Sequence, residues 1–431
     1  SQEIETPKVD FYTYDRWSIL EQIEKDMEFA YQWVPEKVDR GKPSKWACGV
    51  LLMKVCMSLG HFDRAIEIGK EVIAANPLMT ERFTTNKTKP NTNLMHDLHS
   101  VEAKMDMSNP EVEGRDRINT MRNATPYWAN GSIKTPDGKT GMSIVPANEA
   151  KGTELDNDAN VGRGIGTCRP TNYYQYDIWT EKEKNDLRGV YNRDSWKGVF
   201  DLYYNAPALK GTEWYGKHPV KPVGMSVSDS IRCWFQWPHY KTFVPDPSVT
   251  TDRRGGETPW YIYRSAEVYL MLAECYYWKD MKQEAANMMN VVRQRAGAES
   301  LAASDINIGT VLDERARELY YEENRHVELS RISYVYALTG KACEVFGGHV
   351  YKLDNFSGPK GTSVNCKDAG VNFYFDWVSA KNNFYNKGIK TNYAEYRFST
   401  HHVLWPIPEG SITSNTGGVI NQNVGYPGTE N

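Results

Sequence analysis

The chain has 431 residues, of which 40% are hydrophobic and 25% are charged, as is usual for a globular protein. Its formal net charge of −4 is small for this length, and no block of Lys and Arg occurs. These values exclude an electrostatic surface for nucleic acid or for a membrane. No apolar run approaches the roughly 20 residues that span a bilayer. Residues 1–10 contain no signal peptide, so any targeting segment was removed or never present.

The first predicted elements are helices. Apolar residues recur at helical spacing over three segments, which are residues 14–34, 46–58 and 63–75. Gly60 permits a tight turn between the second and third helices, and the small Ala65 lets them approach each other. Pro77 ends the pair. This spacing is that of a tetratricopeptide repeat, in which two antiparallel helices pack across a short turn.

A similar helical pair is predicted further along the chain, over residues 264–278 and 282–295. Asp280 lies at its turn, and Ala285 is the small contact residue. Two degenerate pairs far apart are too few for a solenoid, because repeats need neighbours to bury their faces. We therefore expect both pairs to belong to one helical framework, and a fold that is mostly α.

Another helical block is predicted over residues 311–336, with one apolar face. The opposite face is dense in charge, with Glu314, Arg315, Arg317, Glu318, Glu322, Arg325, Glu328 and Arg331. Opposite charges three or four residues apart stabilise a helix by only about 0.2–0.5 kcal/mol per pair. This density indicates a partly buried ion network that sets the helix register. A pair of catalytic carboxylates is the alternative interpretation.

Between the helical parts, residues 78–258 are rich in Gly, Pro, Asn, Asp and aromatic residues. An insertion of this size without regular structure normally has a function. We expect a single domain over residues 1–431. In it, residues 14–77 and 259–340 form the helical framework, residues 78–258 face the ligand, and residues 341–431 form an irregular C-terminal segment.

Motifs for catalysis or metal binding do not occur in the sequence. Gly162-Arg-Gly-Ile-Gly166 lacks the spacing and the preceding strand of a nucleotide-binding loop, so its glycines indicate a turn. The seven cysteines include no CxxC pair. The acidic turn over residues 154–158 lacks the ligand order of a calcium loop, and a solvated loop is expected there. With no nucleophile elbow and no HExxH motif, we expect neither catalysis, nor a metal, nor a cofactor.

Aromatic content is the unusual quantity, with 13 Trp and 27 Tyr against 13 Phe. Several of these rings lie next to Asn, Asp, Gly or Lys in the irregular stretch. An indole or phenol ring can stack on the C–H face of a sugar while polar groups hold its hydroxyls. Any single ring is more often part of the core. The candidate ligand-binding residues are Tyr127, Trp128, Tyr173, Tyr174, Trp196, Trp214, Tyr215 and Trp237.

Three stretches together resemble the SusD/RagB family in order and spacing. They are YRSAEVYLMLAE over residues 263–274, DERARELYYEENR over residues 313–325, and LWPIP over residues 404–408 with Asn421-Gln-Asn-Val-Gly-Tyr426 behind it. One departure follows Arg325, where the family usually has an aromatic residue and then Asp-Leu, whereas this chain has His326-Val-Glu-Leu329.

The resemblance implies a SusD-like fold: a tetratricopeptide-like helical framework with long irregular insertions. It also implies a surface-exposed lipoprotein of the cell outer membrane that binds an oligosaccharide, with a peptide as the alternative ligand. The partner would be a SusC-like TonB-dependent transporter. A second departure is that the family's further N-terminal segment, with its lipid-modified cysteine, is missing before Ser1, so that this is either a truncated chain or a short variant. Two other functions stay open, a helical glycosidase with carboxylates about 5–9.5 Å apart and a tetratricopeptide-type scaffold for protein interaction.

Overall fold

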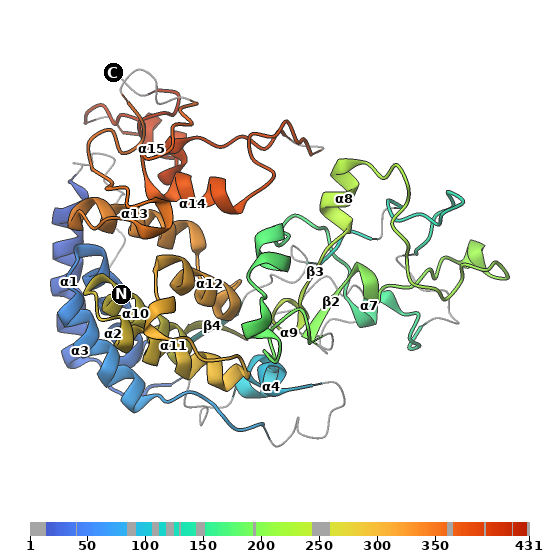
Figure 1. Ribbon diagram of the computed structural model, residues 1–431, viewed down its shortest axis with the longest axis horizontal. Coiled ribbons are helices and arrows are strands. Elements are labelled where there is room, and N and C mark those ends of the chain that lie inside the picture. Colours follow the sequence, from blue (N-terminus) through green and yellow to red (C-terminus); the bar gives the residue numbers. More distant parts are fainter. Residues whose placement is uncertain are drawn as a thin grey trace.

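The computed structural model of the chain describes residues 14–39, 41–83, 92–105, 112–117, 125–128, 131–143, 151–192, 195–243, 259–359, 365–391, 394–415 and 417–428. Residues 1–13 and several stretches of the predicted insertion over residues 78–258 lie outside this set. A helical framework forms one side of the molecule and a more irregular part forms the other (Figure 1). In the described part, no helix is long and apolar enough to cross a membrane.

The three helices predicted near the start of the chain are confirmed. They are α1 (Arg16–Trp33), α2 (Lys45–Leu59) and α3 (Phe62–Ala75). Asp15 caps α1, since its carboxylate accepts a hydrogen bond from the backbone N–H of Trp17 at 2.9 Å. Gly60 ends α2 with φ of +79°, a left-handed conformation that favours glycine. Ala65 is fully buried, as close approach of the two helices requires.

The second pair is also confirmed, as α10 (Ser265–Trp278) and α11 (Lys282–Ala296). Asp280 occupies the turn with φ of +58°, and Ala285 is fully buried. Because α10 packs against both α3 and α11, the two pairs join in one framework. Their shared core includes residues with no exposed surface, among them Leu52, Ile68, Leu272, Val292 and Ile332.

The single helical block predicted over residues 311–336 is wrong, because two helices occupy this region. They are α12 (Ile308–Leu319) and α13 (Arg325–Thr339). The chain leaves the helical conformation after Leu319, and Tyr321 adopts φ of +62°. A right-handed helix cannot continue through a residue in the left-handed region.

Short elements occur within the insertion, and β1 (Val112–Arg117) pairs antiparallel with β4 (Pro259–Arg264), which leads into α10. The second antiparallel pair is β2 (Trp196–Gly198) with β3 (Gln236–Pro238). One turn of π-helix covers Tyr173–Asp177. The short helices are α4 (Leu94–His99), α5 (Val101–Met105), α7 (Asn157–Asn160), α8 (Val227–Cys233) and α9 (His239–Thr242).

The C-terminal segment contributes α14 (Phe373–Lys381) and α15 (Glu409–Thr413). Asn372 caps α14 by accepting a hydrogen bond from the backbone N–H of Phe375 at 2.8 Å. α14 packs against α13 (Figure 1). Its last turns lie near the insertion, since Trp377 and Lys381 line one cavity together with Tyr173.

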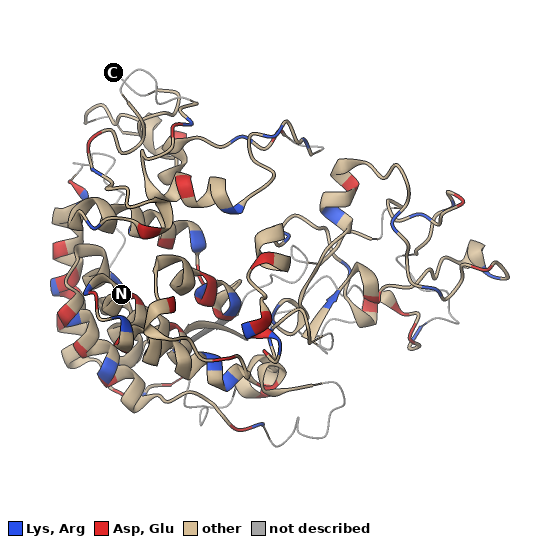
Figure 2. Cartoon of the chain, in the orientation of Figure 1, with Lys and Arg blue, Asp and Glu red and all other residues tan. Residues whose placement is uncertain are grey.

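A buried ion network connects the insertion to α12, which confirms the network predicted from the charge pattern. Arg188, from the insertion, is 1% exposed. It pairs with Glu314 at 2.8 Å and with Glu318 at 2.7 Å. Arg293 of α11 also pairs with Glu314 at 2.8 Å. Acidic and basic residues lie close together along α12 (Figure 2). Burial alone would raise the pKa of Glu314, but Arg188, Arg317 and Arg293 lower it to about 2.

Candidate ligand-binding site

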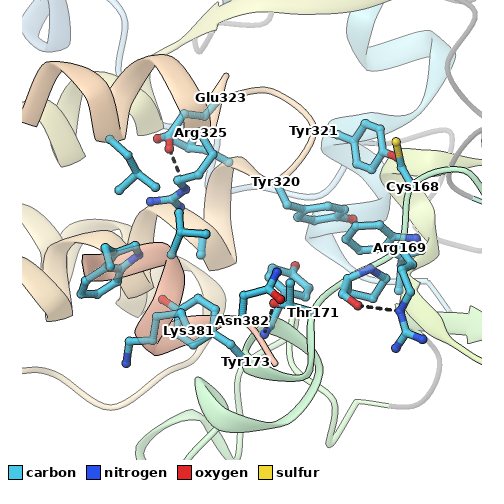
Figure 3. A pocket seen from close by; sticks show the side chains of 18 residues that line it. Cys168, Arg169, Thr171, Tyr173, Tyr320, Tyr321, Glu323, Arg325, Lys381 and Asn382 are labelled. Atoms are coloured by element: carbon cyan, nitrogen blue, oxygen red, sulfur yellow. Dashed lines mark hydrogen bonds and ion pairs between the residues drawn. The ribbon is translucent and has the colours of Figure 1, made fainter. Parts of the chain in front are cut away.

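A cavity of about 420 Å³ lies where the insertion meets the framework. This volume is in the range of about 300–1,000 Å³ typical of small-molecule sites. The framework contributes the end of α12, the loop to α13 and the first turn of α13, and the C-terminal segment contributes the last turns of α14. The insertion contributes residues 168–171, the π-helical turn and β3 (Figure 3). Residues far apart in the sequence therefore form one site.

Six of the 18 described residues that line the cavity are aromatic. Tyr173 meets Trp377 edge-on, with ring centroids 6.3 Å apart and planes at 87°. Trp237 stacks on Tyr320, with centroids 5.8 Å apart and planes at 19°, and it makes a T-shaped contact with Tyr321 at 5.4 Å. These ring contacts fix the orientation of the aromatic side chains. A ligand with a flat apolar face could therefore stack on them without a rearrangement of the wall.

Tyr321 lies in the wall with φ of +62°, an uncommon conformation for a bulky residue. Such strain costs about 1–3 kcal/mol and persists only where the surroundings impose it. The two residues that follow are fixed, because the backbone N–H groups of Glu322 and Glu323 both donate to the carbonyl of Leu319, at 2.9 and 2.8 Å. The Glu323 carboxylate is held by Arg315 at 2.7 Å. The loop thus keeps the Tyr321 ring at the cavity.

The position of Tyr173 is fixed by a partly buried carboxylate of α12. Its hydroxyl donates a hydrogen bond to Asp313. Burial raises the pKa of both groups, so the Tyr173 hydroxyl stays protonated at neutral pH. A neutral, donating phenol orients its ring without adding charge to the site.

Polar groups surround the apolar wall. Thr171 and Asn382 lie on its rim together with the cations Arg169, Arg325 and Lys381. Glu323 is the one carboxylate among the described residues that line the cavity, and it pairs with Arg325 at 3.0 Å. An apolar floor with a polar rim can hold the C–H face and the hydroxyls of a ring.

Three of the aromatic residues predicted from the sequence line this cavity. They are Tyr173, Tyr174 and Trp237. Trp196 lies behind them with no exposed surface, and it stacks on Tyr174 with centroids 6.1 Å apart. Its indole N–H donates to the carbonyl of Arg188 at 2.8 Å. In this structure Trp196 therefore supports the wall rather than forming it.

The other four predicted residues gather in a separate cluster of the insertion. Trp128 is fully buried there, and its indole N–H donates to the carbonyl of Gly162 at 2.9 Å. Tyr127, Trp214 and Tyr215 are partly buried against the same cluster. None of the four lines the cavity described above. Contact of any of the eight rings with a ligand stays a prediction.

Several cavity residues were not predicted from the sequence. Tyr320 was assigned to the apolar face of the helix predicted over residues 311–336, and Tyr321 lies in the same predicted helix. Trp377 lies in a segment expected to be irregular. The apolar residues of Phe373-Tyr-Phe-Asp-Trp377 were the available signal for a buried helix there. Arg169 and Lys381 have no sequence pattern that would single them out.

In the described part of the chain, no group of three or more His, Cys, Asp or Glu residues is placed so that it could bind a metal ion. In the acidic turn, Asp156 caps α7 by accepting from the N–H of Ala159 at 3.1 Å. Cys48, Cys56 and Cys275 are buried in helices, as expected for small apolar residues.

The comparisons with known proteins agree on one family. The SusD family model matches residues 103–426. Surface glycan-binding protein A from Bacteroides thetaiotaomicron is similar in structure, with a TM-score of 0.52 and 16% identity over 94% of this chain and 70% of that chain. Surface glycan-binding protein A from Bacteroides uniformis has a TM-score of 0.50 and 15% identity over 95% and 69%. No curated protein sequence matches. The fold is mostly α, with a tetratricopeptide-like framework, and the chain belongs to the SusD family.

Proposed function

We propose that this chain is a non-catalytic, glycan-binding component of a nutrient-uptake system at the cell surface. It would be a lipoprotein of the outer membrane that works with a SusC-like TonB-dependent transporter. Membership of the SusD family supports this role. So does the likeness in fold to two proteins named as surface glycan-binding proteins.

The cavity at the junction of insertion and framework is the observation that carries the proposal. Its wall offers Tyr173, Trp237, Tyr321 and Trp377 around a volume of about 420 Å³. A pyranose ring stacked on such a wall would exchange water for shape-matched apolar contact, and the rim groups would orient its hydroxyls. Capture of this kind makes and breaks no covalent bond.

The arrangement of carboxylates favours binding over hydrolysis. A glycosidase needs two carboxyl groups about 5–9.5 Å apart across the bond that it cleaves. Glu323 is the one carboxylate among the described lining residues, and Arg315 and Arg325 both bind it. Asp313 is engaged by the hydroxyl of Tyr173. Neither group is placed as a general acid or as a nucleophile.

Binding of the chain to a broad glycan array tests the proposal, with Tyr321→Gly as the cavity variant. Glycine adopts the φ of residue 321 without strain, so this change removes the ring and leaves the loop intact. We expect about a tenfold loss of affinity, in line with the energy of one aromatic contact. Tyr191→Ala is the matched control, because Tyr191 is 50% exposed and lies outside the cavity.

Two results would contradict the proposal. One is the absence of binding to every oligosaccharide on the array. The other is release of shorter products when the bound oligosaccharide is incubated with the purified chain, which would indicate a glycosidase.

A further inference from the structure

The rim of the cavity carries an excess of positive charge. Arg169, Arg325 and Lys381 contribute three cations, against the single carboxylate of Glu323 among the described lining residues. That carboxylate is shared between Arg315 at 2.7 Å and Arg325 at 3.0 Å. Asp313 does not line the cavity, but its carboxylate interacts electrostatically with Arg325 and Lys381. The described lining residues themselves carry a net positive charge, although the whole chain has a formal net charge of −4.

Lys381 is held at the cavity by aromatic rings. Its ammonium nitrogen lies 5.0 Å from the ring centroid of Tyr173 and 5.1 Å from that of Trp377, both cation–π distances. Within the described part of the chain, no carboxylate forms an ion pair with it. The nearby Asp313 is bound by the Tyr173 hydroxyl. The ammonium group thus keeps its hydrogen-bond donors for a ligand.

Arg169 lies across the cavity from Lys381 (Figure 3). Its guanidinium carbon is 5.3 Å from the ring centroid of Phe384 and 5.7 Å from that of Phe235. Its Nε donates to the carbonyl of Pro170 at 3.0 Å. Burial lowers the pKa of Arg169, and among the described residues no carboxylate pairs with it.

A partly desolvated guanidinium without a counter-ion is unfavourable, and an anion that reaches it offsets this cost. The planar guanidinium matches the geometry of a carboxylate or a sulfate, to which it can donate two parallel hydrogen bonds. An ammonium group attracts either anion as a point charge. Both rim cations are therefore suited to acidic groups at the edge of a bound sugar.

We infer that the cavity selects acidic glycans, whose carboxylate or sulfate groups contact Arg169 and Lys381 while a sugar ring stacks on the aromatic wall. The inference rests on the proposed glycan binding and names the class of glycan. Because the two cations lie on opposite sides of the cavity, an oligosaccharide that crosses it meets positive charge on both sides (Figure 3).

The test uses an array of neutral, uronate-containing and sulfated oligosaccharides, followed by calorimetry on a matched pair. The pair is the tightest-binding acidic oligosaccharide and its neutral counterpart, made by carboxyl reduction or by desulfation. We expect the acidic member to bind about tenfold more tightly, and the preference to weaken as salt is added. The uronate and sulfate arms of the array distinguish the two acidic groups.

The variant that tests the assignment combines Arg169→Gln with Lys381→Gln. We expect it to bind the acidic and the neutral member with about equal affinity, because the two cations that favour the acidic member are gone. Lys352→Gln is the control, since Lys352 is exposed and lies outside the cavity. Equal affinity of the unmodified chain for both members of the pair, or a preference retained by the double variant, would overturn the inference and leave the proposed function standing. No binding to any oligosaccharide would refute both.

Discussion

Arg188 is a fully buried guanidinium on which three carboxylates converge. It pairs with Asp186 at 2.7 Å, with Glu314 at 2.8 Å and with Glu318 at 2.7 Å. Burial alone would lower its pKa, but these carboxylates raise it above the usual value. A single residue of the insertion therefore neutralises buried charges of the framework behind the aromatic wall.

Arg188→Ala should destabilise the chain by about 3–5 kcal/mol, because it removes the ion pair of the buried Asp186 and one of the cations that hold Glu314 and Glu318. Urea unfolding followed by circular dichroism measures the loss. Lys42→Ala is the control, because Lys42 and Asp39 form an exposed pair at 2.9 Å, and its effect should stay within about 0.5 kcal/mol. A similar small change for both variants would show that the network does not hold the insertion in place.

The lowered pKa of Glu314 makes the stability of the chain depend on pH. Its pKa in the folded chain is about 2, below the ordinary value of 4.5. A carboxylate with a depressed folded pKa contributes stability that is fully present above its unfolded pKa and is lost as pH falls towards the folded pKa. The free energy of unfolding should therefore decrease from about pH 4.5 towards pH 2.

The variant Glu314→Gln isolates this contribution. It should be less stable than the unmodified chain at pH 7, and its stability should change less between about pH 4.5 and pH 2. Urea unfolding at a series of pH values gives both slopes. Identical slopes for the two chains would show that Glu314 is not a source of the acid sensitivity.

At the scale of elements, the helices with clear periodicity were predicted within about two residues of their ends. The turn residues Gly60 and Asp280 gave reliable boundaries, since both adopt the left-handed conformation. The break between α12 and α13 was not predicted, because Tyr320-Tyr321-Glu322-Glu323 contains no Gly or Pro. The helix breaks where Glu322 pairs with Arg264 and Glu323 pairs with Arg315, and neither pair can be read from the local sequence.

The end of α11 is a second place where the insertion meets the framework. Gly297 ends this helix with φ of +81°, and a Cβ added there would lie 2.9 Å from the carbonyl oxygen of Asn185. The backbone N–H of Leu187 also donates to the carbonyl of Ala296 at 2.8 Å. Gly340 ends α13 with φ of +63°, and an added Cβ there would meet no atom within 4 Å.

The substitution Gly297→Ala should therefore cost more than Gly340→Ala. Both carry the left-handed strain, which destabilises by about 1 kcal/mol. Gly297→Ala adds a clash with the backbone of the insertion, which roughly doubles the loss. Thermal unfolding of the two variants measures the difference. Equal losses of stability would mean that the backbone of the insertion does not restrict the residue at position 297.

At the scale of the whole molecule, the framework was predictable and the site was only partly so. The SusD-like resemblance and the helical pairs follow from local patterns of a few tens of residues. The cavity combines residues 168–171, Trp237, Tyr321 and Trp377, which are separated by long stretches of chain. No local pattern encodes which rings of an aromatic-rich insertion will meet at its junction with α12 and α14.

The burial of Trp128 and Trp196 also shows that sequence neighbours do not identify the rings that bind a ligand. Both rings have polar neighbours in the sequence, which suggested wet surroundings, and both have no exposed surface. Each indole N–H donates to a backbone carbonyl, at 2.9 and 2.8 Å. A buried Trp can thus satisfy its polar edge within the insertion, and sequence neighbours alone do not distinguish it from a binding ring.

The most direct test of glycan capture at the junction cavity is a crystal structure of the chain with its tightest-binding oligosaccharide from the array. We predict a sugar ring against the aromatic wall formed by Tyr173, Trp237, Tyr321 and Trp377, with its glycosidic bonds intact. An oligosaccharide bound elsewhere on the chain, with this cavity empty, would contradict the account.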